Sequence, residues 1–374
     1  MRNNADPLNR TARAPALPGL SRRRLLASSM AAPLWSLAQA AQAQQQMTMP
    51  RDLGSHPDFA IEWWYLTGRL LSGQREFGFQ LTFFRSRVPG TQSMTSAFAA
   101  KQLIFAHAAV TDVAGHKLLH DQRIARQGFD IAQASQTDTD VKLRDWTLRR
   151  DGTRYHAKAV ARDFNFELVL NETQALLLQG DRGLSRKGPQ PAQSSYYYSL
   201  PQLQVAGTLG LGQERLPVLG TAWLDHEWSQ SLLDPQAVGW DWIGINLQDG
   251  SALTAFQLRD KMGKALWDGG SFRSPTLSAQ PQVFRQGEVQ FHAVRQWISP
   301  LTKARYPVEW DVQTPAGLYR IKAVLDAQEL DSRASTGAVY WEGLSELFDS
   351  KGTLVGRGYL EMTGYASPLR LLTF

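Results

Sequence analysis

The sequence contains no cysteine among its 374 residues. Disulfides, thiolate nucleophiles, cysteine-ligated metals and lipid attachment to a cysteine are therefore excluded. Histidine is also scarce, with seven copies, and no histidine pair at metal-ligand spacing lies near the main cluster of ionisable residues. We therefore predict no metal and no cofactor, although Asp225, His226 and Glu227 within that cluster could supply metal ligands.

Long apolar runs and common catalytic motifs are missing as well. After residue 43 no stretch approaches the ~20 apolar residues that a membrane-spanning helix requires, so we expect no transmembrane segment in the mature chain. The sequence has no Gly-x-Ser-x-Gly elbow, P-loop, dinucleotide fingerprint or His-Glu-x-x-His pair. These absences argue against the enzyme classes that depend on such motifs.

The first 43 residues have the order of a signal peptide. Ser21-Arg22-Arg23-Arg24 precedes an apolar stretch over residues 25–37, and the small residues after it offer Ala38-Gln39-Ala40 or Ala41-Gln42-Ala43 for cleavage. A double arginine directly before the apolar run is the feature that twin-arginine export recognises. We expect residues 1–43 to be removed and the mature protein to be periplasmic or secreted. The alternative is a basic leader without a targeting role.

Positive charge is concentrated in that leader. Residues 1–43 hold six arginines and one aspartate, so their removal from the 40 basic and 34 acidic residues of the whole chain leaves 34 and 33. The mature chain then has a net charge of only +1 and scattered charges, whereas a nucleic-acid-binding protein needs a basic patch. We therefore expect no nucleic-acid partner.

What remains is rich in strand signals. Short runs of aromatic and β-branched residues, bounded by glycine, aspartate and proline, recur along the chain; examples are residues 63–67, 77–84, 164–170, 240–247 and 253–258. Residues 92–105 form the best helix candidate, and residues 180–193 indicate a long loop. The pair Asp249-Gly250 is one that a type I′ hairpin turn prefers. The pattern predicts an all-β chain with few short helices.

One of these strands has a clear two-residue period. In residues 76–85, Phe77, Phe79, Leu81 and Phe83 alternate with smaller or polar residues. Side chains alternate between the two faces of a sheet, so one face of this strand should be buried. The other face should line a wetter space.

The densest group of ionisable residues is Asp225-His226-Glu227, framed by Trp223 and Trp228. In a strand, Trp223, Asp225 and Glu227 share one face, and His226 and Trp228 share the other. Two carboxylates about 7 Å apart among indoles would raise each other's pKa and supply a general acid, and His226 could serve as acid, base or donor. The alternative is that Asp225, His226 and Glu227 hydrogen-bond to backbone groups at the end of a strand and that the tryptophans belong to an ordinary core.

Further acids and polar groups lie among aromatic residues. Candidate ligand-binding residues are Glu62, Trp63, Trp64, Tyr65, His107, Tyr197, Trp223, Trp228, Trp242, Trp341 and Glu342. The same theme recurs at Tyr340 and in Tyr359-Leu360-Glu361. For each the alternative is a core or rim position, and a lone histidine in an apolar strand, such as His107, is more often a hydrogen-bonded core residue.

Several of these segments resemble the secreted lipocalin-like family that includes AttH and the bacterial carotenoid 1,2-hydratases. The resemblance spans about residue 50 to the end of the chain. It rests on His56-Pro57-Asp58, Glu62 to Gly68, Ala106-His107-Ala108, Tyr197-Tyr198-Ser199, Ala222 to Ser229, Tyr306 to Trp310, Tyr340 to Gly343 and Gly358 to Tyr365.

This resemblance implies two tandem lipocalin-like β-barrel or sandwich domains with a hydrophobic pocket at or near their junction. We assign residues 44–232 and 233–374 to the two domains. By resemblance, His226 and Trp228 match the hydratases' histidine and tryptophan, Asp225 is the candidate proton donor, and Trp63, Trp64 and Trp242 would face a cation. The hydratases tend to carry Asn where this chain has Glu227, which puts carotenoid hydration itself in doubt.

Two functions follow from these observations. The first is a hydratase or hydrolase that acts on a hydrophobic, isoprenoid- or lipid-like molecule, with Asp225, His226 and Glu227 as catalytic residues. The second is a non-catalytic carrier that binds a lipophilic ligand and works with components of an export transporter. The run of ionisable residues favours the enzyme, since a lipid carrier would be expected to have apolar walls.

Overall fold

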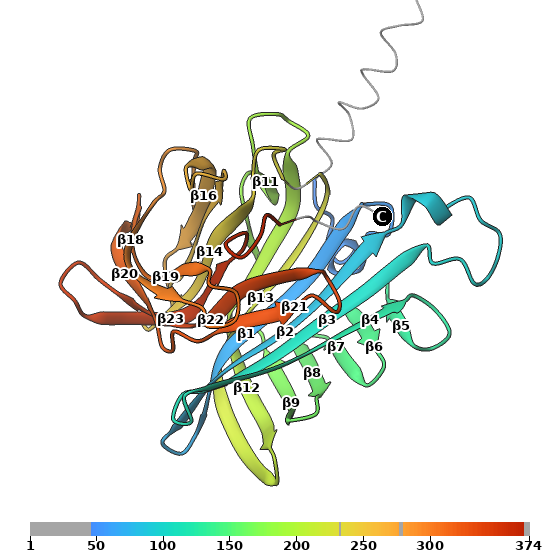
Figure 1. The fold of residues 1–374 in the computed structure, drawn as a ribbon, viewed down its shortest axis with the longest axis horizontal. Coiled ribbons are helices and arrows are strands. Elements are labelled where there is room, and N and C mark those ends of the chain that lie inside the picture. Colours follow the sequence, from blue (N-terminus) through green and yellow to red (C-terminus); the bar gives the residue numbers. More distant parts are fainter. Residues whose placement is uncertain (1–45, 232, 277–279, 370–374) are drawn as a thin grey trace, which may run out of the picture. The chain divides into compact units, whose positions relative to one another are not determined.

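A computed structural model describes residues 46–231, 233–276 and 280–369. The expected signal peptide lies outside these residues. The first sheet follows the order β4-β3-β2-β1-β13-β12-β9-β8-β7-β6-β5, and β10 and β11 also pair with β12 (Figure 1). Its strands are β1 (Ile61–Ser72), β2 (Arg75–Arg87), β3 (Gln102–Asp112), β4 (Lys117–Arg126), β5 (Ala132–Ala134), β6 (Asp140–Leu143), β7 (Trp146–Asp151), β8 (Arg154–Val160), β9 (Phe164–Asn171), β10 (Leu177–Leu178), β11 (Leu184–Arg186), β12 (Ser194–Leu211) and β13 (Glu214–Ser231).

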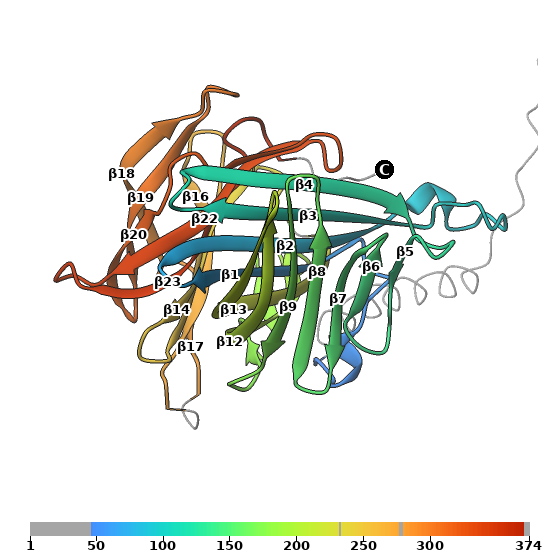
Figure 2. The same ribbon diagram turned by 90° about the horizontal axis from the view of Figure 1, so that it is seen from below.

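The second sheet contains the remaining strands in the order β17-β16-β15-β14-β23-β22-β20-β19-β18, with β21 paired to β22. These strands are β14 (Gly239–Leu247), β15 (Ala252–Arg259), β16 (Ala265–Arg273), β17 (Gln282–Phe284), β18 (Gln290–Ile298), β19 (Arg305–Thr314), β20 (Gly317–Ala323), β21 (Glu329–Ser332), β22 (Ala338–Phe348) and β23 (Leu354–Met362). Figure 2 shows β14, β22 and β23 beside the end of the first sheet where β1 and β3 end and β2 and β4 begin.

The predicted all-β class is confirmed. The helical elements of the described chain are two short 3-10 turns, η1 (Arg51–Leu53) and η2 (Pro89–Thr91). The helix expected over residues 92–105 is wrong, because turns and irregular structure occupy residues 92–101 and β3 begins at Gln102. The turn at Asp249-Gly250 is not type I′ either, since only Gly250 has a positive φ, as in a three-residue hairpin loop. The loop expected over residues 180–193 contains the short strand β11.

Each sheet buries one face in its own core. On β2 the predicted apolar set, Phe77, Phe79, Leu81 and Phe83, lies in the core of the first sheet and is fully buried. In the second sheet, Ile243, Ile245, Leu253, Leu360 and Met362 belong to a separate core. The remaining face of each central strand is free to pack against the other sheet, and this packing positions the candidate site.

The contact between the sheets forms a third apolar cluster, which includes Tyr65, Trp223, Trp242, Leu344 and Tyr359. The approach is close at Gly78, where a Cβ atom would lie 2.7 Å from the Tyr359 hydroxyl. Residues 46–374 form one compact unit, so the division at residue 232 into two domains stays a prediction. Within the described chain no helix has the length and apolar character needed to span a membrane.

Candidate functional site

A cavity of about 100 Å³ lies between the two sheets. The outward-facing residues of β1, β2 and β13 form one wall, and those of β14, β15, β22 and β23 form the other. Its lining consists of Ile61, Trp63, Tyr65, Gln80, Thr82, Phe84, Lys187, Tyr197, Asp225, Glu227, Trp240, Trp242, Phe256, Leu258, Tyr340, Glu342 and Glu361. The position agrees with the junctional pocket that the family resemblance implies.

Asp225 is held on β13 by three hydrogen bonds. Its Oδ1 accepts from the Ser199 hydroxyl at 2.6 Å and the Trp223 indole at 2.7 Å, and its Oδ2 accepts from the Tyr197 hydroxyl at 2.8 Å. Burial raises the pKa of Asp225 to about 7, although these three donors act to lower it. Asp225 is therefore a fixed group that can change protonation near neutral pH.

Glu227 lies two residues further along the same face and has a different environment. Its Oε1 is 3.1 Å from Lys187 Nζ and also accepts a short hydrogen bond from the Ser195 hydroxyl. Lys187 is itself buried, with its ammonium 4.2 Å from the Phe256 ring centroid. Lys187 and Ser195 therefore hold the Glu227 carboxyl in place in the cavity wall.

The opposite wall holds a pair of carboxyl groups. Glu342 on β22 and Glu361 on β23 are direct cross-strand neighbours. Burial and the charge of Glu361 hold the pKa of Glu342 well above its usual range, and burial raises the pKa of Glu361 to about 7. Gln80 donates to Glu342 Oε2 at 2.9 Å, and the Tyr65 hydroxyl also interacts with this carboxyl and acts to lower its pKa. The pair therefore keeps a proton at neutral pH.

Aromatic rings cover much of the rest of the wall. Trp63 and Tyr65 come from β1, and Trp240 and Trp242 come from β14. Trp242 packs edge-on against Tyr65 with 5.3 Å between ring centroids, and its indole donates to the Tyr197 hydroxyl at 3.2 Å. Indole faces attract cations, so these walls suit a substrate that develops positive charge.

The raised pKa of Asp225 predicts a pH-dependent stability. The folded chain binds this proton more tightly than the unfolded chain, so the group's contribution to the free energy of unfolding falls as pH rises from about 4 to about 7. The shift corresponds to at most about 4 kcal/mol. We expect Asp225→Asn to gain stability relative to the parent as pH rises from about 4 to about 7, as measured by urea unfolding. Asp58→Asn, on an exposed turn, is the control, and an unchanged difference across this range would contradict the prediction.

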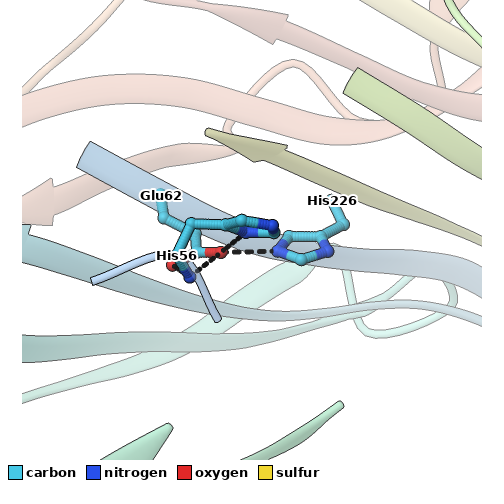
Figure 3. Close-up of side chains that lie close together, drawn as sticks. All are labelled: His56, Glu62 and His226. Carbon is cyan, nitrogen blue, oxygen red and sulfur yellow. Dashed lines mark hydrogen bonds and ion pairs between the residues drawn. The ribbon is translucent and has the colours of Figure 1, made fainter. Parts of the chain in front are cut away.

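A second polar cluster lies on the core side of β1 and β13, away from the cavity wall. Figure 3 shows His56, Glu62 and His226 pointing toward one another. Glu62 Oε1 lies 2.8 Å from His56 Nδ1 and 2.9 Å from His226 Nε2, and Glu62 Oε2 accepts from Arg85 Nε at 2.7 Å. Glu62, Arg85 and His226 are fully buried. We call these four residues the Glu62 network.

The charge states of the Glu62 network follow from its contacts. Burial lowers the pKa of His226 to about 4, so its neutral ring donates from Nε2 to Glu62 while Nδ1 accepts from the Tyr198 hydroxyl. Burial acts to lower the pKa of His56, but hydrogen bonds to Asp52 and Glu62 raise it overall. Burial acts to raise the pKa of Glu62, but bonds from His226 and His56 and the Arg85 charge hold it well below its usual range.

Three members of the Glu62 network, His56, Glu62 and His226, offer ligand atoms within 4.8 Å of one another, which is compatible in distance with a metal ion. Their donor set argues against one. Arg85 already places a cation on Glu62, and both imidazoles are directed at the same carboxylate oxygen. The arrangement is that of a buried ion-pair network that joins the N-terminal segment to β1, β2 and β13.

The structure separates the predicted site residues into three groups. Those that line the cavity are Trp63, Tyr65, Tyr197, Asp225, Glu227, Trp242 and Glu342. Trp223 lies directly behind Asp225, and His107 lines a neighbouring cavity. Glu62, Trp64, His226, Trp228 and Trp341 lie in the cores instead. His226 faces away from Asp225 and Glu227, as strand alternation predicts, so these three residues do not form one catalytic cluster.

Sequence reasoning assigned no site role to Lys187, Gln80, Thr82 or Phe84. The last three occupy the face of β2 opposite the buried apolar face, so the two-residue period already placed them together; whether the space beside them is wetter stays a prediction. Lys187 lies at the end of β11, within a segment read only as a loop. No local pattern indicates that its side chain reaches Glu227.

The chain is similar to several known proteins. A family model described as AttH-like matches residues 40–365. A crystal structure of an AttH protein from Nitrosomonas europaea is 47% identical, with 86% of this chain and 98% of that chain covered and a TM-score of 0.80. Kievitone hydratase from Nectria haematococca shares the fold at 13% identity, with 86% and 94% covered and a TM-score of 0.67. No curated protein sequence matches.

Proposed function

Because the chain belongs to the AttH-like family, we propose that it is an enzyme that adds water to a carbon–carbon double bond of a hydrophobic, isoprenoid-like molecule. The observation that carries this proposal is the pair of neighbouring carboxyls, Glu342 and Glu361, in the wall of an aromatic cavity. The fold shared with kievitone hydratase supports the reaction class. Carotenoids are one such substrate, but no feature of the cavity selects them.

The reaction requires an acid strong enough to protonate carbon and a base that receives a proton from water. Glu342 gives its proton to one alkene carbon, and the positive charge develops on the neighbouring carbon. The rings of Trp63, Trp240 and Trp242 stabilise this cation. A water molecule then bonds to the cation and loses a proton to Glu227, whose charge Lys187 maintains. The net change is the addition of one water molecule.

The two walls therefore have different roles. Glu342 and Glu361 are cross-strand neighbours, and the pKa of Glu342 is held well above its usual range, whereas Glu227 forms an ion pair with Lys187. Environments that push the pKa values of nearby acids apart are a recurring way to place an acid and a base in one site. The cycle closes when Glu227 releases its proton to solvent and Glu342 takes one up from solvent.

The direct test is to incubate the parent protein with apolar alkenes in ¹⁸O-labelled water and to analyse the products by mass spectrometry. Addition of one labelled hydroxyl group is the expected result. Ligand binding without any turnover over a broad panel of alkenes and esters would overturn the enzyme and favour the carrier, in which case components of an export transporter would be the partners to test by co-purification.

We further propose that the protein is exported by the twin-arginine route to the periplasm or beyond. The leader's arginine run before an apolar stretch supports this. We expect the triple substitution Arg22→Lys, Arg23→Lys and Arg24→Lys to keep the precursor in the cytoplasm on cell fractionation. Arg10→Lys with Arg13→Lys, in the same leader but outside the run, is the matched control. Unchanged export of the triple variant would contradict the route.

A further inference from the structure

Two loops lie at the end of the first sheet that is far from β14, β22 and β23, one after η2 and one between β4 and β5 (Figure 2). The first loop carries Phe98, which is 73% exposed, and the second carries Phe129, which is 51% exposed. The two rings stack on each other with 5.5 Å between their centroids. Met94 and Ile131, from the same two loops, are 50% and 40% exposed. We call these four apolar residues the Phe98 patch.

The backbone at Phe129 has a conformation that bulky residues rarely adopt. Phe129 and Asp130 have φ values of 58° and 55°, and the Ile131 N–H donates to Gly128 O at 3.1 Å, which closes a tight turn. Positive φ at both central residues is what a type I′ turn requires, and asparagine or glycine ordinarily supplies it. The turn therefore holds a phenylalanine that its own geometry disfavours, and the ring is half exposed to solvent.

Positive charge surrounds the Phe98 patch. The Arg126 guanidinium carbon lies 5.3 Å from the Phe98 ring centroid and 4.0 Å from that of Phe129. Arg87 and Lys101 flank the loop that carries Phe98, and residues 88–100 between them include no acid. Within the described part of the chain, none of these three cations forms an ion pair with a carboxylate.

The acid closest to the patch along the chain is Asp130, beside Phe129. Its charge is already balanced, because Lys142 Nζ lies 2.7 Å from Asp130 Oδ1. The surroundings of the two rings therefore have a net positive charge. A partner that covers the patch should be apolar where the rings enter it and anionic around them.

An anionic lipid bilayer has both properties. Peripheral proteins bind its interface with a few apolar side chains at the boundary of the acyl chains and with basic residues among the headgroups. A stable protein interface instead needs roughly 20–30 residues on each side. The Phe98 patch is much smaller than that, which favours a bilayer over a protein partner.

We propose that the Phe98 patch docks this protein onto the surface of an anionic lipid bilayer. The rings of Phe98 and Phe129 enter the boundary of the acyl chains, and Arg87, Lys101 and Arg126 face the headgroup phosphates. This inference goes beyond the proposed function and does not depend on any reaction in the cavity.

A site-specific label tests the proposal in the full chain, which has no cysteine of its own. Thr95→Cys places one thiol in the exposed loop beside Phe98, and Ser350→Cys places one on an exposed turn of the second sheet as the control. Each is labelled with the environment-sensitive fluorophore NBD and mixed with vesicles of phosphatidylglycerol and phosphatidylcholine in equal parts. We expect a rise and a blue shift of the emission at residue 95 only, and a weaker response to phosphatidylcholine alone.

Substitution of the two rings should weaken binding to the same vesicles. In co-sedimentation, Phe98→Ser with Phe129→Asn should lower the affinity by about tenfold or more, because two large apolar side chains no longer enter the bilayer. The midpoint of urea unfolding should not fall, since asparagine tolerates a positive φ at position 129. Leu219→Ser with Met262→Ser, at exposed apolar positions elsewhere, is the control and should bind like the parent.

The basic residues have a separate test. Lys101→Gln with Arg126→Gln should weaken binding to the anionic vesicles and make it less sensitive to salt, because fewer charges face the headgroups. Lys261→Gln with Lys351→Gln, on exposed turns, should leave both properties unchanged.

Unchanged emission at residue 95 in the presence of anionic vesicles would overturn the proposal. Equal vesicle binding by Phe98→Ser with Phe129→Asn and by its control would do the same. If the patch instead joins two copies of the chain, sedimentation equilibrium will show a dimer that Phe98→Ser with Phe129→Asn abolishes, with no response to vesicles, and bilayer docking is then wrong.

Discussion

Glu342→Gln is expected to lower the rate of alkene hydration by about 10²- to 10⁴-fold, the usual contribution of a general acid. Glutamine keeps the volume of the side chain and can still bond to Gln80, but it has no acidic proton to give to carbon. The equilibrium Kd for an apolar ligand should change little, because the side chain contributes one polar group to a largely aromatic wall. Single-turnover rates and ANS displacement separate the two effects.

Glu361→Gln distinguishes the acid from its neighbour. The charge of Glu361 contributes to the raised pKa of Glu342, so its removal should lower that pKa. The rate falls when Glu342 loses its proton, and this fall should therefore occur at lower pH in Glu361→Gln than in the parent. Glu167→Gln, on an exposed part of β9, is the control for loss of a carboxylate. Full turnover by Glu342→Gln would remove Glu342 from the mechanism.

Much of the cavity could be predicted from local sequence periods. The alternation of Phe77, Phe79, Leu81 and Phe83 identified the buried face of β2, and the opposite face lines the cavity. The same rule placed Asp225 and Glu227 together and His226 apart from them. Each inference needs only the two-residue period of a strand, which is a local property of the sequence.

What could not be predicted depends on pairings between distant segments. Glu62 and His226 are 164 positions apart and meet because β1 pairs with β13, with Trp64 opposite His226. Glu342 and Glu361 became a pair through the register of β22 with β23. A motif rich in acids and tryptophans therefore indicated a candidate site, but it did not show which face of the sheet borders the cavity. Four of the predicted site residues lie on the core side of the first sheet and do not line the cavity: Glu62, Trp64, His226 and Trp228.

Arg85→Met is expected to have the largest effect on stability, a loss of about 3–5 kcal/mol in the free energy of unfolding. Arg85 is fully buried and donates to Glu62 Oε2 at 2.7 Å, to Gln102 Oε1 at 2.8 Å and to two backbone carbonyl groups. Methionine fills similar space but leaves Glu62 buried without its strongest cation. Urea unfolding at neutral pH measures the loss.

Arg75→Met is the matched control, because Arg75 lies on the same strand and forms ion pairs with Asp112 and Glu214 at the surface. Its loss should be about 0–1 kcal/mol. Adding Glu62→Gln to Arg85→Met removes the buried charge as well, so the double variant should be more stable than the sum of the two single losses predicts. Strict additivity would mean that Arg85 does not act through Glu62.

The pH dependence gives an independent check on the same network. The pKa of Glu62 is below its usual 4.5 in the folded protein, so the stability that Glu62 provides is present above about pH 4.5 and is lost as pH falls through the lower folded value. Without the Arg85 charge the folded pKa rises toward the unfolded one. Arg85→Met should therefore unfold in acid at a higher pH than the parent, whereas Arg75→Met should not. A metal ion held by His56, Glu62 and His226 would instead make acid stability sensitive to EDTA, and the ion-pair network predicts that EDTA has no effect.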